Sequence, residues 1–292
     1  MTERLILCLA CAAAMVSQTP PPRLTPMQDA FAELPGVRLG YRDSGGSGIP
    51  VVLLHAATGS SRVWEHQEGA FTAAGYRVIA YDRRGFGRTV VTTSGATTAA
   101  GADDLHALVE HLHIDRFHLV STAAGAFVGI DYALSFPRQL RSIVLANTIG
   151  GVQDEEFLEL GRRIRPPSFA SMPPDFRELG PSYRAGNPEG TKRWLELERA
   201  SRAGGGGDTS GTPAPTQPMR NRVTLASLET IAVPTLLLTG DADLYAPPAV
   251  MRLFAARIKN AESVVVPEAG HSAYWEQPEI FNRAVLEFLK KH

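Results

Sequence analysis

Three residues, each close behind an apolar strand pattern, could form one chemical site: Ala123, Asp243 and His271. Residues 118–129 read HLVSTAAGAFVG, in which a strand pattern leads through small residues into a helix pattern. This is the setting of a nucleophile elbow, a sharp turn that lifts a serine hydroxyl above a sheet. The spacing to Gly125 puts the nucleophile position at Ala123, which has no hydroxyl group. The surroundings of a nucleophile are therefore predicted without the reactive atom.

An acid and a base can be placed by the same reasoning. The segment PTLLLTGDAD ends at Asp243, and ESVVVPEAGHS is a short strand pattern followed by His271. A carboxylate holds the tautomer of a histidine, and the histidine can then accept a proton from a nucleophile. Asp241 is the alternative acid, but its place two residues earlier favours a role in the turn. The chain order of nucleophile position, acid and histidine is 123, 243, 271.

An oxyanion hole needs two backbone N–H donors beside the nucleophile. The expected donors are Ala124, which follows the nucleophile position, and Ala57 in the loop after the strand pattern 49–55, with Ala56 as the alternative to Ala57. His55 is expected to anchor this loop rather than to catalyse. Arg83, Arg84 and Arg88 are expected to hold the loop after Asp82.

Several motifs occur together in a consistent order. With these motifs the chain resembles the α/β-hydrolase superfamily, most closely its bacterial esterase, cofactor-free haloperoxidase and carbon–carbon hydrolase branches. The likeness covers about residues 28–150 and 230–292. It rests on LLHAATGSSRVW at 53–64, YDRRGFGRT at 81–89, GDAD at 240–243 and GHS at 270–272, in addition to the elbow.

Strand and helix patterns alternate, which predicts an α/β fold with right-handed crossovers. The resemblance implies an eight-stranded, mostly parallel sheet flanked by helices. It also implies a core at 25–149 and 228–292 and a helical cap at 150–227. Within the cap, the Gly/Pro-rich composition of 204–218 predicts a flexible segment. Expected strands are 29–33, 37–43, 49–55, 76–82, 117–121, 140–147, 234–239 and 263–266; expected helices are 98–113, 124–136 and 281–290. The cap aromatics, among them Phe157, Phe169, Phe176, Tyr183 and Trp194, are expected either to line a pocket or to pack the cap on the core.

The N-terminal segment 1–24 resembles a secretory signal peptide with a proline-rich linker. Its apolar run, Leu5 to Val16, is shorter than the roughly 20 residues of a membrane-spanning helix. Export to the periplasm or medium is expected, with a cytoplasmic location as the alternative. Cys8 and Cys11 are the only cysteines and lie in this segment, so a processed chain would have no disulfide or thiolate metal site.

Composition limits the partners. The net charge of −1, from 29 Lys+Arg and 30 Asp+Glu, provides no basic surface for nucleic acid. The sequence predicts a small-molecule substrate, no cofactor, no metal and no membrane span; the oligomeric state stays open.

Three interpretations of Ala123 remain. The chain could be a hydrolase of small, largely apolar esters, lactones or related acyl compounds whose serine is replaced by alanine. It could be a cofactor-free lyase or oxygenase-type enzyme that uses His271 and Asp243 without a serine. It could also be a ligand-binding pseudoenzyme, although a pure binder has no need of an oriented histidine–aspartate pair.

Overall fold

The computed structural model describes residues 26–92, 99–165, 167–203 and 217–292. The predicted signal peptide and most of the Gly/Pro-rich segment 204–218 lie outside these residues. Within the described ranges, no helix is long and apolar enough to cross a bilayer.

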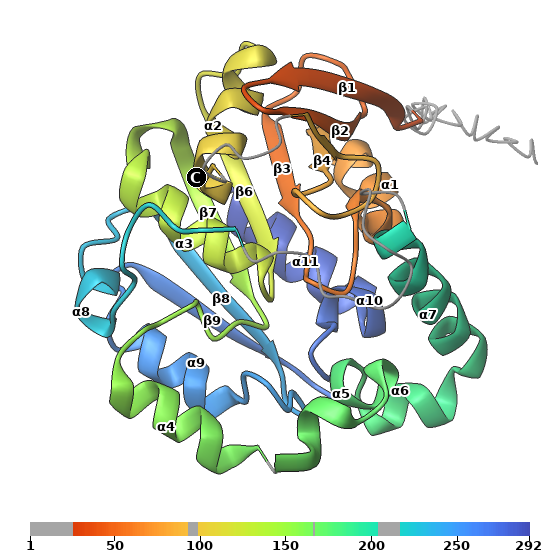
Figure 1. The fold of residues 1–292 in the computed structure, drawn as a ribbon, viewed down its shortest axis with the longest axis vertical. Helices are drawn as coiled ribbons and strands as arrows, with labels where there is room; N and C mark the ends of the chain where they lie inside the picture. The colour runs from red at the N-terminus through yellow and green to blue at the C-terminus, as the bar shows by residue number, and fades with distance from the viewer. Residues whose placement is uncertain (1–25, 93–98, 166, 204–216) are drawn as a thin grey trace, which may run out of the picture.

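One sheet of nine strands runs through the described chain (Figure 1). Its order is β1-β2-β4-β3-β6-β7-β8-β9, and β5 pairs with β2. The pairs between β4 and β9 along this path are parallel, whereas β1, β2 and β5 form antiparallel pairs. The strands are β1 (Gln28–Leu34), β2 (Val37–Asp43), β3 (Pro50–Leu54), β4 (Arg77–Tyr81), β5 (Val90–Val91), β6 (Phe117–Thr122), β7 (Leu140–Ala146), β8 (Thr235–Gly240) and β9 (Ala261–Val266).

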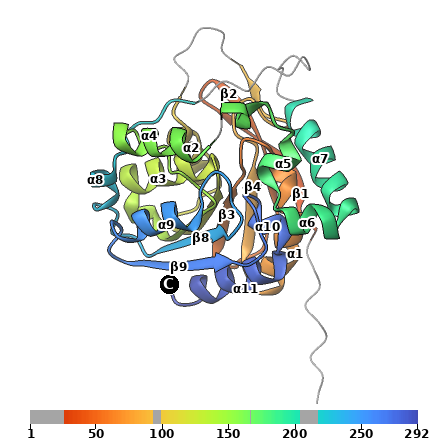
Figure 2. The same ribbon diagram turned by 90° about the horizontal axis from the view of Figure 1, so that it is seen from below.

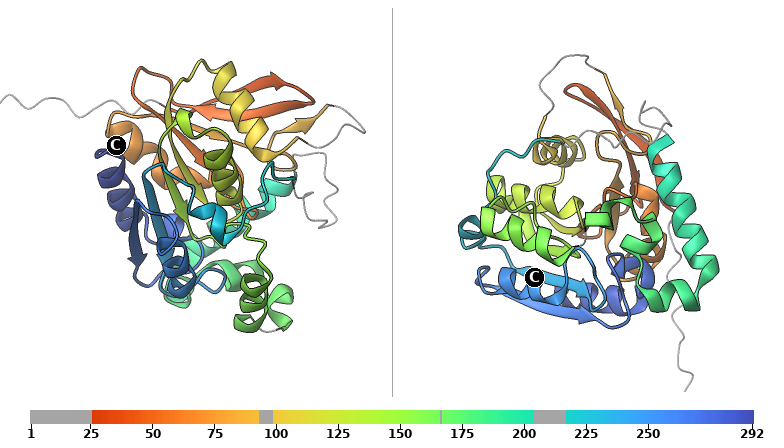
Figure 3. Two further views of the ribbon diagram at one scale, coloured as in Figure 1. Left: turned by 90° about the vertical axis from the view of Figure 1, so that its left-hand side faces the viewer. Right: turned by 60° about the horizontal axis from the view of Figure 1, so that its bottom comes forward.

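Helices cover both faces of the sheet, as the further views show (Figure 3). The α-helices are α1 (Glu65–Ala73), α2 (Gly101–His111), α3 (Gly125–Ser135), α4 (Glu155–Ile164), α5 (Pro174–Glu178), α6 (Pro181–Gly186), α7 (Pro188–Ala203), α8 (Leu225–Leu228), α9 (Pro248–Ala255), α10 (Ala273–Glu276) and α11 (Pro278–Leu289). Short 3-10 helices are η1 (Ser61–Trp64), η2 (Pro137–Gln139) and η3 (Pro167–Ser171).

Strand β3 shows why the sequence builds two cores. Its residues are apolar without alternation, as expected for a parallel strand buried on both faces. Successive side chains point to opposite faces. Val52 and Leu54 therefore join the core that contains α2, α3 and α9, while Val51 and Leu53 join the core that contains α1 and α11.

The predicted mostly parallel sheet is confirmed along its eight-strand path. The ninth strand, β5, was not predicted, because two residues are too few to show a periodic pattern. The described parts of the predicted cap segment, 150–227, contain α4 to α8. Figure 1 shows α4, α5 and α6 beyond the lower ends of the strands, and Figure 2 views the molecule from that side.

Gly125 allows α3 to begin directly against the sheet. A Cβ atom at this position would lie 2.6 Å from the carbonyl oxygens of both Leu54 and His55. These are backbone atoms at the end of β3, so they cannot rotate away as a flexible side chain could. The elbow therefore needs glycine here because of close approach.

Gly125→Ala is expected to lower the free energy of unfolding by about 1–3 kcal/mol, the usual range for overpacking a filled site. Urea unfolding followed by circular dichroism measures this loss. Gly69→Ala is the matched control, because Gly69 lies in α1 and a Cβ there has nothing within 4 Å. The control is expected to be neutral or up to about 1 kcal/mol stabilising. Equal stability changes in the two variants would contradict the close approach.

Candidate functional site

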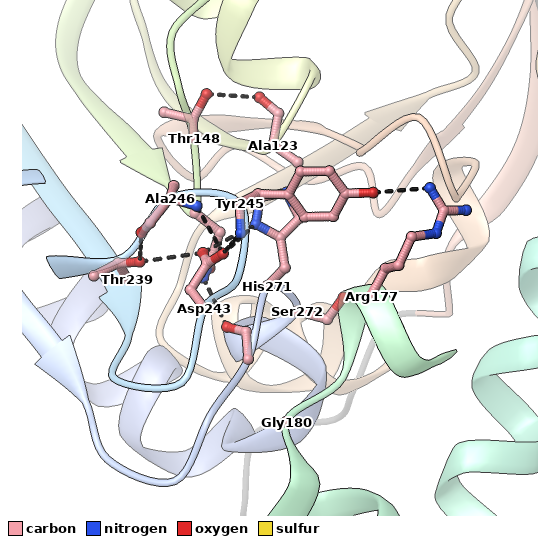
Figure 4. Close-up of polar contacts among 12 residues, drawn as sticks. Ala123, Thr148, Arg177, Gly180, Thr239, Asp243, Tyr245, Ala246, His271 and Ser272 are labelled. Carbon is pink, nitrogen blue, oxygen red and sulfur yellow. Dashed lines mark hydrogen bonds and ion pairs between the residues drawn. The ribbon is translucent and has the colours of Figure 1, made fainter. Parts of the chain in front are cut away.

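Ala123 lies at the apex of the turn between β6 and α3. Its φ is +50°, in the left-handed region that residues other than glycine adopt rarely. Hydrogen bonds hold this conformation, since its N–H donates to Ala146 O (2.9 Å) and its carbonyl accepts from Thr148 Oγ1 (2.9 Å; Figure 4). Its side chain is nearly buried and lines a cavity. The surroundings thus hold a left-handed backbone conformation at a residue whose side chain is a methyl group.

Asp243 follows β8 and is held by a complete set of donors. Its Oδ1 accepts from the backbone N–H groups of Tyr245 and Ala246, both at 2.8 Å. Its Oδ2 accepts from Asn147 Nδ2 (3.0 Å), and Thr239 Oγ1, which donates to Ala246 O at 2.7 Å, lies 3.2 Å from it. Burial alone would raise the pKa of the Asp243 carboxyl, but the neighbouring imidazole and these hydrogen bonds lower it below its usual value. Asp243 is therefore kept ionised.

His271 follows β9 and contacts Asp243, not Asp241. Its Nδ1 lies 2.9 Å from each carboxylate oxygen of Asp243, and its backbone N–H donates to Glu178 O at 2.8 Å. Asp241 is exposed. Burial alone would lower the pKa of His271, but the carboxylates of Asp243 and then Glu178 raise it above its usual value. With Nδ1 directed at Asp243, Nε2 is the nitrogen available to a substrate or nucleophile.

A cavity of about 180 Å³ brings the predicted residues together. Ala123 and His271 line it, as do both residues predicted as oxyanion donors, Ala57 and Ala124, and the alternative Ala56. Among the described contacts, the N–H groups of Ala57 and Ala124 donate to no protein acceptor. They are therefore free to bind a substrate oxygen, as an oxyanion hole requires.

Glu178 is a cavity residue that the sequence analysis missed. It ends α5, a helix of the predicted cap segment, and it is buried beside His271. Burial raises the pKa of the Glu178 carboxyl, and the nearby His271 opposes that shift. No periodicity or motif marks Glu178, because it reaches the site through a contact between segments far apart in the sequence. Asn147 was also missed, although a polar residue directly after the β7 pattern is a signal that could have found it.

Glu276 positions the loop that carries His271. Its carboxylate accepts the backbone N–H groups of Gly180 (2.7 Å), Gly270 (3.0 Å) and Ser272 (3.2 Å). Burial raises the pKa of Glu276 to about 7, although these hydrogen bonds lower it. One buried side chain thus ties the histidine loop to the start of α6.

The aromatic side chains that line this cavity are not the ones singled out in the cap. Phe127 of α3 and Tyr245 of the Asp243 loop line it. The ring centroids of Tyr245 and His271 lie 4.4 Å apart (Figure 4). The Tyr245 hydroxyl accepts from Arg177 Nη1 at 2.9 Å. The cap residues instead pack elsewhere or face solvent: Phe169 stacks edge-on against Tyr245, Phe157 packs on Phe254, Trp194 is in the core and Phe176 is exposed.

His55, Arg84 and Arg88 are held by contacts within the protein, whereas Arg83 makes fewer polar contacts. His55 is fully buried, its Nδ1 lies 2.7 Å from Ala56 O, and its Nε2 accepts from the N–H of Arg83 at 3.0 Å. Burial and the nearby Arg83 hold the pKa of His55 well below its usual value. Arg84 binds Asp104, and Arg88 donates to Tyr41 O. The Arg83 side chain makes no comparable hydrogen bond through Nε or Nη2 in the described contacts, but its guanidinium carbon lies 4.8 Å from the ring centroid of Phe86 in the same loop.

Glu178→Gln is expected to lower the pKa of His271, because the Glu178 carboxylate is one of the charges that raise it. Imidazole resonances followed by NMR during a pH titration measure the shift. His118 serves as an internal reference, since it is a buried histidine whose pKa burial lowers to about 4. A His271 titration that does not move, or one that moves together with His118, would contradict the contact.

Comparison with known proteins agrees with this fold. A sequence model of the alpha/beta hydrolase family matches residues 51–284. The chain is 31% identical, over 87% of its length and 98% of the relative, to a Mycobacterium tuberculosis protein named "Putative non-heme bromoperoxidase BpoC". It is 28% identical, over 87% and 91%, to a 2-hydroxy-6-oxononadienedioate/2-hydroxy-6-oxononatrienedioate hydrolase of Paraburkholderia xenovorans.

A solved structure has the same architecture. It is that of a thermophilic esterase from Thermogutta terrifontis with malate bound, which is 29% identical with a TM-score of 0.73. The match covers 90% of this chain and 98% of the esterase. The similarity therefore extends over most of both chains, not over one motif alone.

Proposed function

Because the chain belongs to the α/β-hydrolase family, we propose that it carries an acyl-hydrolase site of the Ser-His-Asp type with alanine in the nucleophile position. The proposed substrates are small, largely apolar esters, lactones or related acyl compounds. In such a site His271 takes the nucleophile's proton, Asp243 holds the imidazole tautomer and stabilises the imidazolium, and the N–H groups of Ala57 and Ala124 bind the developing oxyanion.

One observation carries this proposal: the left-handed conformation of Ala123 in a cavity shared with His271. A left-handed φ at a non-glycine residue costs on the order of 1–2 kcal/mol, and it persists where surrounding structure enforces it. Such strain gathers at active sites. A methyl group gains nothing from this apex, whereas a hydroxyl there would be presented to the imidazole.

The cavity supports the substrate class. Its volume of about 180 Å³ suits a small molecule, and its walls include the apolar side chains of Phe127 and Ile149. The similar proteins include one named as an esterase and one named as a 2-hydroxy-6-oxononadienedioate/2-hydroxy-6-oxononatrienedioate hydrolase, which supports a hydrolytic reaction. A hydrolytic reaction on a small acyl compound is therefore the proposed activity of this architecture.

A second candidate is proton transfer without a nucleophile, and Glu178 favours it. The cavity contains an imidazole whose pKa is raised and a buried carboxyl whose pKa is also raised, on different elements. Two titratable groups in such surroundings can serve as base and acid. In this reading His271 removes a proton from a bound substrate and Glu178 returns one, and alanine at position 123 is no obstacle.

Labelling with a fluorophosphonate tests the first candidate. The Ala123→Ser variant is expected to gain one phosphonyl group per chain, on the peptide that contains position 123, because the imidazole activates the new hydroxyl. The chain with Ala123 is expected to gain none. A folded Ala123→Ser protein that stays unlabelled, together with substrate turnover by the chain with Ala123, would favour the second candidate.

A further inference from the structure

Glu178 brings an unpaired carboxyl group to the cavity that contains His271. The residue is 5% exposed and lines this cavity from α5. Its side chain accepts no hydrogen bond of ordinary geometry from the described residues, whereas its backbone oxygen accepts the N–H of His271. Its Oε atoms are not among the side-chain atoms that are both unpaired and closed off from solvent. The carboxyl group therefore has surface that a molecule in the cavity can reach.

The arginine next to Glu178 in the sequence is held by other partners. Arg177 Nη1 donates to the Tyr245 hydroxyl at 2.9 Å, and Arg177 Nε donates to Met172 O at 3.1 Å. Arg177 and the Tyr245 hydroxyl lower the pKa of the Glu178 carboxyl, but Arg177 forms no ion pair with it. Among the described residues, no lysine or arginine lines the cavity. A carboxylate ligand would find no counter-ion there except a protonated His271, whereas a cationic ligand would find one in Glu178.

A protonated His271 is the cation that the cavity itself provides for Glu178. Each group favours the charged form of the other, since His271 lowers the pKa of the Glu178 carboxyl and the Glu178 carboxylate raises the pKa of His271. A general base must be neutral, so this pairing favours the form of His271 that cannot accept a proton.

A cation from outside the protein would change this balance. A buried carboxylate is costly unless a positive charge or hydrogen bonds compensate it, and a bound cation would supply both to Glu178. The same positive charge would disfavour the imidazolium and lower the pKa of His271. Binding of a cation beside Glu178 would thus prepare His271 for proton transfer.

We propose that the Glu178 carboxylate binds a protonated amine of the substrate. The inference rests on the proposed function, because it places this amine in the same cavity as the reacting carbonyl at Ala57 and Ala124. The substrate class is then a small acyl compound that carries an ammonium group. Phe127 and Ile149 supply apolar walls for the hydrocarbon part of such a molecule. A compound that carries a carboxylate instead would be repelled by Glu178.

Calorimetric titration of the chain with Ala123 tests this site without requiring turnover. The probes are benzylamine, which is protonated at neutral pH, benzyl alcohol, which is neutral, and benzoate, which is an anion. They share a ring and a similar size, and they differ in charge. Benzylamine is expected to bind at least tenfold more tightly than benzyl alcohol or benzoate, because a hydrogen bond between two charged groups is roughly twice as strong as one between neutral groups.

Glu178→Gln keeps the shape of the side chain and removes its charge. It is expected to weaken benzylamine binding at least tenfold and to abolish the preference for benzylamine over benzyl alcohol. Glu156→Gln is the matched control, because Glu156 is exposed on α4 in the same predicted cap segment, and it is expected to leave both affinities unchanged. Glu178→Asp keeps the charge and covers the case in which Glu178→Gln fails to fold. It is expected to retain the preference for benzylamine.

The imidazole resonances of His271 give a second measurement. Saturating benzylamine is expected to lower the pKa of His271, whereas benzyl alcohol is expected to leave it in place. The proposal is overturned if benzylamine does not bind, or if benzyl alcohol or benzoate binds as tightly. It is also overturned if Glu178→Gln keeps the preference, if Glu178→Asp loses it, or if bound benzylamine leaves the pKa of His271 unchanged. These outcomes do not depend on hydrolysis, so failure of the amine site and failure of the acyl-hydrolase site are told apart by benzylamine binding and by fluorophosphonate labelling.

Discussion

Ala123→Ser is expected to raise the hydrolysis of p-nitrophenyl acetate by on the order of 10³-fold or more over the chain with Ala123. The reverse change, removal of the serine nucleophile from the assembled triad of subtilisin, lowers kcat by about 10⁶-fold. The gain is expected because the apex conformation, the imidazole and the free N–H groups are already present, so the substitution adds the one missing atom. Release of p-nitrophenolate, measured under single-turnover and steady-state conditions, gives the rate.

Ala124→Ser is the matched control for this gain. It adds the same hydroxyl one residue further along, at the position before α3 begins, and it is expected to give no hydrolysis above the chain with Ala123. Equal activity of the two variants would mean that any added hydroxyl suffices, which contradicts an apex at position 123. A folded Ala123→Ser protein without ester hydrolysis would contradict the acyl-hydrolase proposal itself.

Asp243→Asn, introduced into the Ala123→Ser background, is expected to lower kcat by on the order of 10⁴-fold, as in the corresponding change of a known triad. The asparagine cannot stabilise the imidazolium that forms when His271 takes the proton. The pH profile should change as well. His271 must be neutral to act as a base, so activity rises with pH through its pKa, and Asp243 is the largest contribution that raises that pKa. Without this carboxylate, the acidic limb of kcat/KM should move to lower pH while the plateau falls.

Asp241→Asn is the control for this loss, since Asp241 is exposed in the same loop and is the alternative acid of the sequence analysis. It is expected to change kcat less than threefold and to leave the acidic limb in place. A larger loss of kcat from Asp241→Asn than from Asp243→Asn would contradict the assignment of Asp243 as the acid. A fall in the plateau with an unmoved limb would indicate that Asp243 supports the loop without acting through His271.

Strands of the fold could be predicted where the residues of a single strand form a recognisable pattern. The apolar runs that became β3 and β8 are buried on both faces, so their composition alone marks them. The positions of Ala123, Asp243 and His271 could be predicted because each follows such a strand, and the carboxyl ends of parallel strands meet at one edge of a sheet.

The rest of the site depends on contacts that composition does not encode. Glu178 reaches His271 because α5 lies beyond the strand ends, and its own neighbourhood, PPDFRELG, reads as an ordinary short helix.

The most direct test of the central claim is a crystal structure of the Ala123→Ser variant after reaction with a fluorophosphonate. Phosphorus is expected on the side-chain oxygen of residue 123, with the phosphonyl oxygen within hydrogen-bond distance of the N–H groups of Ala57 and Ala124, and with His271 still bound to Asp243. A phosphonyl oxygen that points away from both N–H groups, or an imidazole turned away from residue 123, would contradict the assignment of Ala123 to the nucleophile position.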